Sequence, residues 1–250
     1  MPTLILPPRF SEDSNTLWRT AIELGWDIER LQSWRVPEGF RPDGDVAIYG
    51  ESLWANFVAE QLGVKLYEPP LDWLASLDYE FVGRCIEFCT FEEARTKQFP
   101  LFVKPASEKT FEARVYAGAH ELPADIDQPE LAPVLTSQPV EWEVEYRCFV
   151  LEERVVTASS YWRGEDSTRK EDGSYDSPPE ELKAACDFAG RVIGKSGGGF
   201  GERGAVIDVG ILRGFGWAVV EANPAWGAGF YGCDPRKALG VIASCVSKSP

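Results

Sequence analysis

Two apolar runs joined by a glycine-containing turn constrain the fold of this chain most. They lie within residues 206–224, are rich in Val and Ile, and flank Gly214 and Phe215. This pattern predicts a β-hairpin. If Gly214-Phe215 is a two-residue loop with Gly at its first central position, Asp208 lies opposite Glu221 on the paired strands, with Cβ atoms about 5 Å apart.

The acidic side chains of this hairpin predict a metal site. Asn223 lies two residues after Glu221 and therefore on the same face of its strand. Two directly opposed carboxylates repel each other unless a cation lies between them. Together with an amide oxygen they suit Mg²⁺, which completes its shell with water and substrate phosphates. The predicted ligands are Asp208, Glu221 and Asn223. The alternative is a solvated hairpin whose acids align by chance.

Composition limits the partners. The chain has 250 residues, of which 44% are hydrophobic and 12% aromatic, enough for a core in one large or two smaller domains. The formal charge of −15 argues against nucleic acid as a partner, because proteins that bind its backbone present basic faces. A nucleotide ligand remains compatible with this charge, since it needs only a few local cations and a metal.

The chain is expected to be cytoplasmic and without a membrane partner. It has no apolar run long enough for a membrane helix, and its first residues lack the basic and apolar regions of a signal peptide. Its six cysteines form no CxxC pair, which favours reduced structural thiols. A single histidine, His120, lies in the polar stretch 117–133. A single histidine excludes a zinc site with several His ligands, and we expect His120 in an exposed loop.

Strands and helices alternate over the first 70 residues, which predicts a small open parallel sheet in an α/β domain. A helix over 14–24 is expected to begin at Ser14 or Asn15 and a second over 51–62 to end at Gly63. The expected strands are 3–6, 46–49 and 64–67. Pro69-Pro70 marks a candidate boundary, so we predict one domain over 1–75 and a second over 76–250.

The second part mixes helices and strands. Helical segments are expected near 71–98, including one after a Thr90 cap, and further helices over 180–193 and 236–246. The polar stretch 163–179 is predicted to be a mobile loop. The expected strands are 101–104, 113–116, 134–137, 140–151 and 154–162.

Two basic residues are candidates for binding phosphate or carboxylate groups. Lys104 ends an apolar strand, where it is either a solvated strand end or a phosphate ligand.

Arg147 shares a face of its strand with Glu145. A tight turn at Glu152-Glu153 would place Arg147 opposite Ala158 and Glu145 opposite Ser160. A buried arginine needs an anionic partner, which is either a ligand or Glu145 itself; a solvated face is the other alternative.

The glycine run 197–201 is not a phosphate-binding loop of the Walker type. No Lys and hydroxyl residue follow its last glycine, and it precedes a predicted strand rather than a helix. We interpret it as a connector. The small residues after Asn223 place a loop beside the predicted metal, where a backbone can approach a ligand closely.

These motifs, in this order, resemble the ATP-grasp superfamily. The matching segments are Phe-Val-Lys-Pro-Ala at 102–106, Glu-Tyr-Arg-Cys-Phe-Val at 145–150, Asp208, and Glu-Ala-Asn-Pro at 221–224. They are most similar to the clade named for two conserved arginines and a lysine. The resemblance implies an α+β ATP-grasp fold, with a small N-terminal open parallel α/β domain followed by two α+β subdomains that grip ATP between them.

The resemblance also implies roles for individual residues. ATP would be bound by a hinge near 134–140, whose backbone reads the adenine around Ser137 to Val140. Lys104 would contact the α- and β-phosphates, and Arg147 would stabilise charge on the transferring phosphoryl group. One or two Mg²⁺ ions would be held by the hairpin residues named above. The remaining implied ATP-binding residues are Arg84, Lys109 and Glu145.

The implied activity is that of an ATP- and Mg²⁺-dependent carboxylate–amine ligase that forms an acyl phosphate. The substrate would be an amino acid, a peptide or a similar small carboxylate. Two alternatives stay open: a kinase on the same fold, and a nucleotide-binding module without turnover. The sequence does not determine the oligomeric state.

Overall fold

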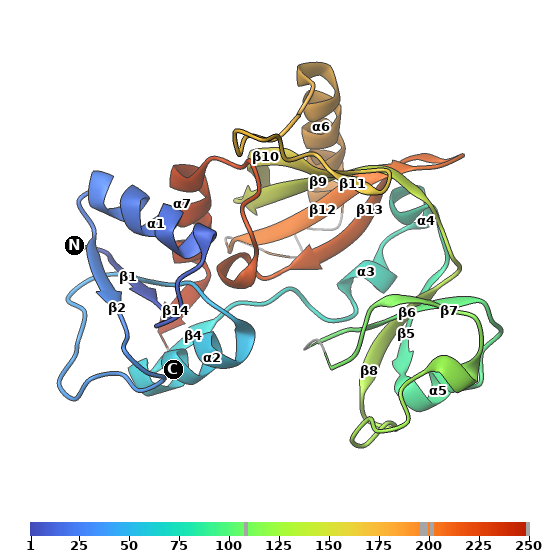
Figure 1. The fold of residues 1–250 in the computed structure, drawn as a ribbon, viewed down its shortest axis with the longest axis horizontal. Helices are drawn as coiled ribbons and strands as arrows, with labels where there is room; N and C mark the ends of the chain where they lie inside the picture. Colours follow the sequence, from blue (N-terminus) through green and yellow to red (C-terminus); the bar gives the residue numbers. More distant parts are fainter. Residues whose placement is uncertain (108–109, 196–199, 201–202, 249–250) are drawn as a thin grey trace.

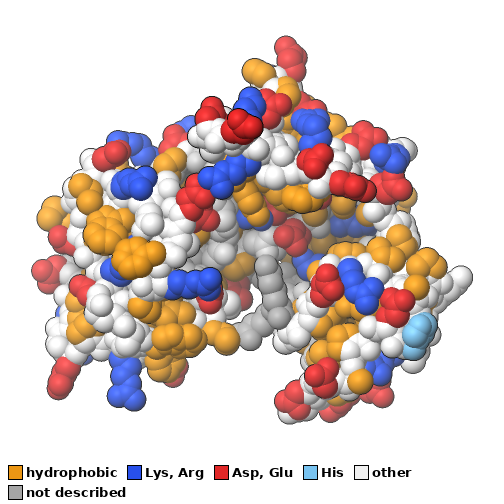
Figure 2. All heavy atoms as spheres, viewed as in Figure 1, with side chains coloured by type: hydrophobic (Ala, Val, Ile, Leu, Met, Phe, Trp, Pro, Cys, Tyr) orange, Lys and Arg blue, Asp and Glu red, His pale blue; other side chains and the backbone are white. Residues whose placement is uncertain are grey.

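The computed structural model describes residues 1–107, 110–195, 200 and 203–248. The chain forms an N-terminal α/β unit, a central five-stranded sheet and a smaller four-stranded sheet (Figure 1). The mixed fold predicted from the sequence is confirmed. Figure 2 shows that the surface is hollowed between the N-terminal unit and the smaller sheet. Among the described residues, no helix is both long and apolar enough to cross a membrane.

The N-terminal unit contains the predicted open parallel sheet, with strand order β2-β1-β3. Helix α1 (Glu12–Glu23) begins earlier than expected because Ser11, not Ser14 or Asn15, is its N-cap, and the Ser14 side chain completes a capping box. Helix α2 (Ser52–Leu62) ends at left-handed Gly63, as predicted. The strands are β1 (Thr3–Leu6), the unpredicted β2 (Asp27–Arg30) and β3 (Val46–Ile48).

The C-terminal segment completes this unit. Strand β4 (Val64–Leu66) does not join the parallel sheet but pairs antiparallel with β14 (Val246–Lys248). Helix α7 (Pro235–Ser244) is capped by Asp234, and its buried side chains share one hydrophobic cluster with β1, β3 and α2. This cluster also contains Trp226, whose Nε1 donates to the Tyr67 carbonyl at 2.8 Å. The division of domains at residue 75 stays a prediction.

The smaller sheet has the order β5-β8-β6-β7 and its own hydrophobic cluster, which includes Phe91 of the covering helix α5. Strand β5 lies where helices alone were expected, but the predicted Thr90 cap is confirmed by a capping box with Glu93. The elements are α3 (Trp73–Ser76), α4 (Tyr79–Val82), β5 (Ile86–Thr90), α5 (Phe91–Arg95), β6 (Leu101–Pro105), β7 (Arg114–Tyr116), η1 (Ala119–Glu121) and β8 (Pro133–Ser137).

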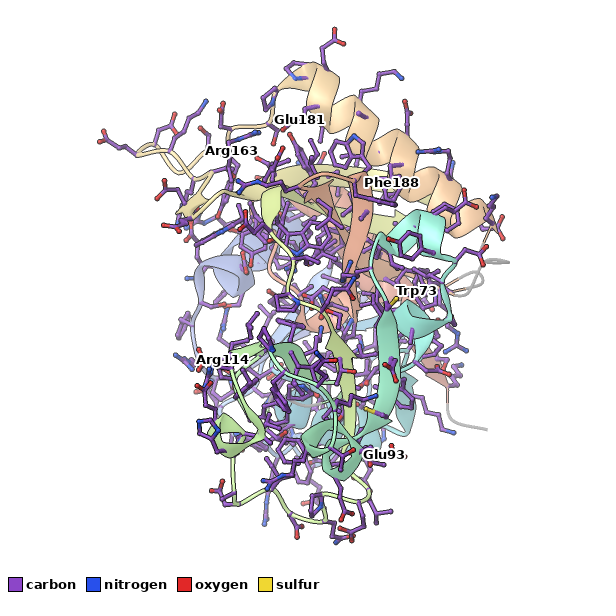
Figure 3. All side chains as sticks on the ribbon, turned by 90° about the vertical axis from the view of Figure 1, so that its right-hand side faces the viewer. Trp73, Glu93, Arg114, Arg163, Glu181 and Phe188 are labelled. Carbon is purple, nitrogen blue, oxygen red and sulfur yellow. The ribbon has the colours of Figure 1, made fainter. Side chains whose placement is uncertain are left out.

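The central sheet has the order β11-β10-β9-β12-β13 and is antiparallel. Helix α6 (Pro179–Lys195) covers one face, and Phe188 contributes to the hydrophobic cluster beneath it (Figures 1 and 3). The other face meets the N-terminal unit through Phe149 and Val206. The strands are β9 (Trp142–Leu151), β10 (Arg154–Arg163), β11 (Asp166–Ser167), β12 (Ala205–Leu212) and β13 (Gly216–Asn223); η2 (Ala225–Gly227) follows.

Candidate active site

The acidic hairpin has the predicted pairing of Asp208 with Glu221, but for a different reason. The loop has three residues rather than two, because Leu212 pairs with Gly216 and both Gly214 and Gly216 have positive φ. A β-bulge next to Asp208 then adds one residue to β13 and shifts the register by one. The two departures cancel at the acidic pair. The predicted two-residue loop is therefore wrong, but the predicted opposition of the two carboxylates is confirmed.

The predicted register of β9 with β10 is wrong. Arg147 lies opposite Ser159 instead of Ala158, and Glu145 lies opposite Trp162 instead of Ser160. Two bulges in β10, at Val156 and Tyr161, account for the successive shifts. Nothing in the alternation of side chains reveals a bulge, and each one changes which residues face each other beyond it.

Asp208, not Glu145, is the anionic partner of Arg147. The Arg147 Nε lies 2.9 Å from Asp208 Oδ1, and its Nη2 lies 2.6 Å from Oδ2. Asp208 is fully buried. Burial by itself lowers the pKa of Arg147, but the Asp208 carboxylate outweighs this, and the pKa lies above its ordinary value. The third contact of Arg147 is from Nη1 to the Gly229 carbonyl at 3.1 Å.

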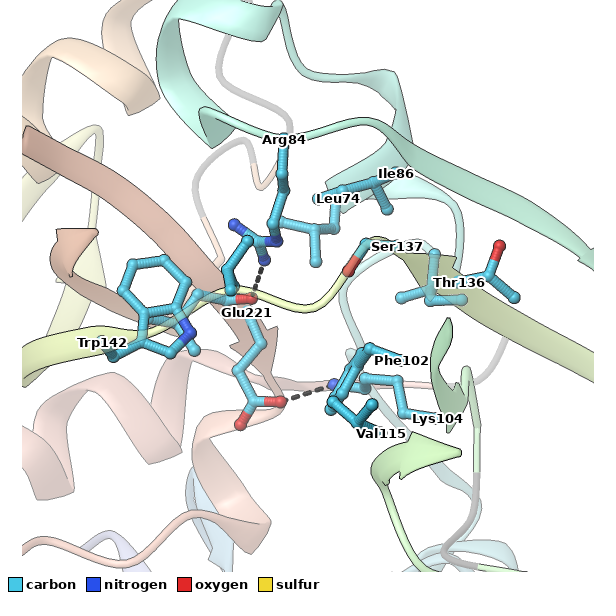
Figure 4. Close-up of a pocket in the computed structure, with 13 residues that line it drawn as sticks. Leu74, Arg84, Ile86, Phe102, Lys104, Val115, Thr136, Ser137, Trp142 and Glu221 are labelled. Carbon is cyan, nitrogen blue, oxygen red and sulfur yellow. Dashed lines mark hydrogen bonds and ion pairs between the residues drawn. The ribbon is translucent and has the colours of Figure 1, made fainter. Parts of the chain in front are cut away.

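Lys104 reaches across from the smaller sheet to the central sheet. Its Nζ lies 2.5 Å from Glu221 Oε2 (Figure 4). Asn223 Nδ2 donates to Glu221 Oε1 at 2.8 Å. Burial by itself raises the pKa of Glu221, but the charge and hydrogen bond of Lys104 outweigh burial and lower the pKa to about 2. Lys104 is therefore ion-paired and not a solvated strand end, and its role as a phosphate ligand stays a prediction.

A cavity of about 250 Å³ lies beside this ion pair, between the two sheets (Figure 4). Its walls are mostly apolar, and Lys104 and Glu221 form part of its boundary. Ser137 and Val140, at the predicted hinge, also line it. The other lining residues are Leu74, Arg84, Ile86, Phe102, Val115, Leu135, Thr136, Trp142 and Val220.

Arg84 is held in the cavity wall by backbone carbonyls. Its guanidinium donates to the carbonyls of Val82, Val219 and Val220 at 2.8–3.0 Å and lies over the Trp142 ring. Burial lowers its pKa to about 10. Three of its five N–H groups therefore bind protein, which makes Arg84 as much a structural clamp between α4 and β13 as a ligand donor. Lys109 lies outside the described residues.

Two tyrosines that sequence reasoning missed surround Arg147. Tyr161 donates its hydroxyl proton to Glu145 Oε2 at 2.5 Å and stacks on Tyr231 with ring centroids 4.8 Å apart. The Arg147 guanidinium lies 5.4 Å from the centre of the first ring and 4.8 Å from that of the second. The bulge at Tyr161 turns this side chain toward Glu145, so strand periodicity gave no signal for it.

The segment 163–179, predicted to be a mobile loop, is fastened to β10. Ser160 Oγ donates to Asp176 O at 2.6 Å, and the Ser160 backbone N–H donates to Ser177 Oγ at 2.9 Å. Its Tyr175 ring packs edge-on against Tyr231. These contacts bring the segment next to Arg147.

The N-terminal unit also reaches the site. Asp13, in the first turn of α1, accepts a hydrogen bond from the Phe230 N–H. The Tyr49 hydroxyl lies 3.3 Å from Asp13 Oδ2 and 3.1 Å from the Ala228 carbonyl, so its single proton is shared between them. No motif identified Asp13 or Tyr49, since both lie far from the hairpin in sequence.

The hairpin offers hard oxygen donors that fit Mg²⁺. Asp208 and Glu221 are directly opposed, and Asn223 is bonded to Glu221. Each carboxylate oxygen accepts one hydrogen bond from protein and keeps a second lone pair for a metal. Within the described part of the chain, no group of three or more His, Cys, Asp or Glu side chains forms a metal cluster. Two carboxylates and one amide suit an ion that also binds phosphate oxygens.

Residues 81–241 match the model of an ATP-grasp domain family, the second family of the clade named for two arginines and a lysine. The chain belongs to this family. The resemblance read from its motifs is thereby confirmed. No curated protein matches the chain.

Solved ATP-grasp structures share the fold. A RimK domain protein from Sphaerobacter thermophilus DSM 20745 aligns with a TM-score of 0.55 and 15% identity, covering 98% of this chain and 99% of its own. The ATP-grasp ligase PsnB with minimal precursor, Mg and ADP gives 0.52 and 16%, covering 96% of each chain. The macrocyclase MdnC with precursor peptide MdnA, from Microcystis aeruginosa MRC, gives 0.50 and 13%, covering 97% and 99%.

Proposed function

We propose that this ATP-grasp protein is an ATP- and Mg²⁺-dependent carboxylate–amine ligase. The observation that carries the proposal is the ion pair of Lys104 with Glu221 at the edge of the apolar cavity, next to the pair of Arg147 with Asp208. Two cations and two carboxylates beside this cavity can bind a triphosphate and its metal, while the base lies between the apolar walls of the cavity.

The cavity is the proposed nucleotide site. Its apolar side chains would pack on both faces of the adenine, and the backbone near Ser137 and Val140 would bind its edge. Lys104 would leave Glu221 and bind the phosphates. Arg84 would bind the nucleotide through its remaining N–H groups. Lys109 is proposed as a further phosphate contact.

Asp208, Glu221 and Asn223 are the proposed ligands of Mg²⁺. The metal would supply charge neutralisation and polarisation of the phosphate oxygens. The ion pairs seen in the structure hold these carboxylates in place and satisfy their charge. When the nucleotide binds, its phosphates would pair with Lys104 and Arg147, and the metal would pair with the carboxylates of Glu221 and Asp208. No buried charge would then be left unpaired.

Arg147 is the proposed catalytic residue. Its guanidinium would stabilise the charge on the phosphoryl group as the substrate carboxylate attacks it. Asp208 and the Gly229 carbonyl fix the plane of the guanidinium, and Glu145, held by Tyr161, is proposed to bind the nucleotide on the same face. An amine then displaces phosphate from the acyl phosphate and forms an amide.

The similar structures support a peptide or other small substrate. PsnB is a ligase described with a minimal precursor, Mg and ADP, and MdnC is a macrocyclase described with a precursor peptide. We propose a carboxylate and an amine carried by small molecules or peptides, and no nucleic-acid partner. The six free cysteines fit a reducing cytoplasmic location.

A thermal-shift titration with ATP, ADP and GTP, each with and without Mg²⁺, tests nucleotide binding, because a ligand of the native state raises the Tm. A panel of amino acids and peptides is then incubated with ATP, Mg²⁺ and hydroxylamine, which traps an acyl phosphate as a hydroxamate. Hydroxamate formation supports the ligase. A stable phosphorylated product that forms without amine indicates a kinase, and binding without turnover indicates a nucleotide-binding module.

A further inference from the structure

The loop after β13 is bonded, residue by residue, to different parts of the molecule. The Ala228 carbonyl faces the Tyr49 hydroxyl, the Gly229 carbonyl accepts from Arg147, and the Phe230 N–H donates to Asp13. This chain of contacts links the N-terminal unit to the proposed catalytic arginine. Asp13 and Tyr49 lie outside residues 81–241, which match the family.

The space above Gly229 has a distinctive chemical boundary. A Cβ added to this glycine would lie 3.3 Å from Asp13 Oδ2, 3.8 Å from Arg147 Nη1 and 3.9 Å from Tyr231 Cζ. A carboxylate, a guanidinium and a phenol thus converge on one point. Asp13 and Gly229 are partly accessible to solvent and 40% of Tyr231 is exposed, so a small ligand can approach these three groups from solvent.

The charges around this point favour a cation. Asp208 balances the charge of Arg147 through two hydrogen bonds. Asp13 accepts hydrogen bonds from a phenol and a backbone N–H and is attracted by the Arg147 charge, but among the described residues no Lys or Arg forms an ion pair with it. One negative charge is therefore left at a place where a ligand can approach.

We propose that Asp13 binds the ammonium group of the amine substrate in the space above Gly229. This inference rests on the proposed ligase function and adds to it the residue that recognises the amine. The same carboxylate accepts one proton from the ammonium group and passes it to solvent. The amine lone pair then attacks the acyl carbon, the carbon–oxygen bond to phosphate breaks, and phosphate leaves with that electron pair and takes up the second proton.

The surroundings of Asp13 suit this task. Burial raises the pKa of Asp13, although the Phe230 N–H opposes the shift, and a raised pKa makes the carboxylate a better proton acceptor. Gly229 has no side chain to fill the space between Asp13 and Arg147. The amine therefore lies next to the group that is proposed to bind the phosphorylated carboxylate.

The test compares two nucleophiles in the wild type and in Asp13→Asn. The first is hydroxylamine, which is uncharged at neutral pH. The second is the amine that gives the fastest phosphate release among methylamine and the twenty amino acids, with the carboxylate that gives hydroxamate. Asp13→Asn should raise the KM for the charged amine at least about tenfold. It should leave hydroxamate formation and the KM for ATP within about twofold of wild type.

Three further variants keep the test decisive. Gly229→Ala keeps every charge but fills the space, and should also raise the amine KM. Glu12→Gln removes the neighbouring acid, which pairs with Arg169 on the surface, and should change nothing. Tyr49→Phe keeps the Asp13 charge and should affect the amine KM less than Asp13→Asn does.

An unchanged amine KM in Asp13→Asn overturns the inference, as does an equal increase in Glu12→Gln, which would indicate a long-range charge effect. If the wild type yields neither hydroxamate nor amine-dependent phosphate, the proposed function itself fails. If wild type and Asp13→Asn both yield hydroxamate and respond equally to the amine, only the amine site fails.

Discussion

Lys104 and Glu221 join two sheets that share no strand, with 2.5 Å between Nζ and Oε2. Side chains at such a junction are partly shielded from water, with 19% of the Lys104 side chain and 30% of the Glu221 side chain exposed. Their attraction is therefore screened less than that of a surface pair. The pair holds the cavity walls together in the structure and is the contact that a triphosphate would compete for.

Lys104→Met should weaken ATP binding in the presence of Mg²⁺ by about 10- to 100-fold, because a charge-assisted bond to phosphate is lost. Isothermal titration calorimetry measures the change directly. Lys97→Met is a suitable control, since this lysine also pairs with a glutamate, Glu87, but does not line the cavity. ATP affinity equal to that of wild type in Lys104→Met would return this lysine to a purely structural role.

Glu221 should contribute a pH-dependent part of the stability. Its pKa is lowered from 4.5 to about 2 in the folded protein. A group with a depressed folded pKa stabilises the fold above its unfolded pKa, and this stabilisation is lost as the pH falls toward the folded pKa. We therefore expect the free energy of unfolding to decrease between about pH 4.5 and pH 2.

Urea titrations at pH 5 and pH 3 on wild type and Lys104→Met measure this contribution. The variant should lose less stability between the two pH values than wild type, because Glu221 has then lost the cation that lowers its pKa. Parallel losses in the two proteins would show that other carboxylates account for the acid sensitivity.

The sequence predicted one strand pairing correctly and another wrongly. The Val- and Ile-rich hairpin was correctly predicted to place Asp208 opposite Glu221, because an error in loop length and an unseen bulge cancelled. On β10 the bulges do not cancel, and the predicted neighbours of Arg147 were wrong. A bulge depends on how the whole sheet bends, and short-range alternation contains no information about it.

The sequence also did not predict the contacts between distant parts of the chain. Tyr161 reaches Glu145 only because of a bulge, and Asp13 reaches the loop after β13 only because the N-terminal unit packs against that loop. Strand β14, near the end of the sequence, pairs with β4 (Val64–Leu66). Local patterns predict elements, but the packing of separate units decides which side chains meet.

Asp208→Asn should lower the free energy of unfolding by about 3–5 kcal/mol, because it leaves the buried Arg147 without a charged partner. The double variant Arg147→Met with Asp208→Leu should recover part of this loss, since well-packed apolar residues can replace a buried pair. Denaturant unfolding of wild type, Asp208→Asn, the single variants Arg147→Met and Asp208→Leu, and the double variant checks both expectations. A double variant as unstable as the sum of the single changes would mean that the two residues stabilise the fold independently.

Tyr161→Phe should separate the hydroxyl of this residue from its ring. The variant keeps the stack on Tyr231 and the contact with Arg147 but removes the only hydrogen bond that Glu145 accepts from a side chain of the described residues. Glu145 is half-buried, and the loss of a hydrogen-bond donor to a carboxylate costs at most about 1–3 kcal/mol, so Glu145 should bind a proton at higher pH or move.

If Glu145 binds the nucleotide as proposed, Tyr161→Phe raises the KM for ATP and leaves the amine KM unchanged. Tyr231→Phe is the matched control, because it removes a phenol hydroxyl from the same stack without touching Glu145. Initial rates of phosphate release, measured with ATP and amine varied in turn, separate the two constants. An ATP KM that rises equally in both variants would attribute the effect to the stack around Arg147 and not to the hydrogen bond that orients Glu145.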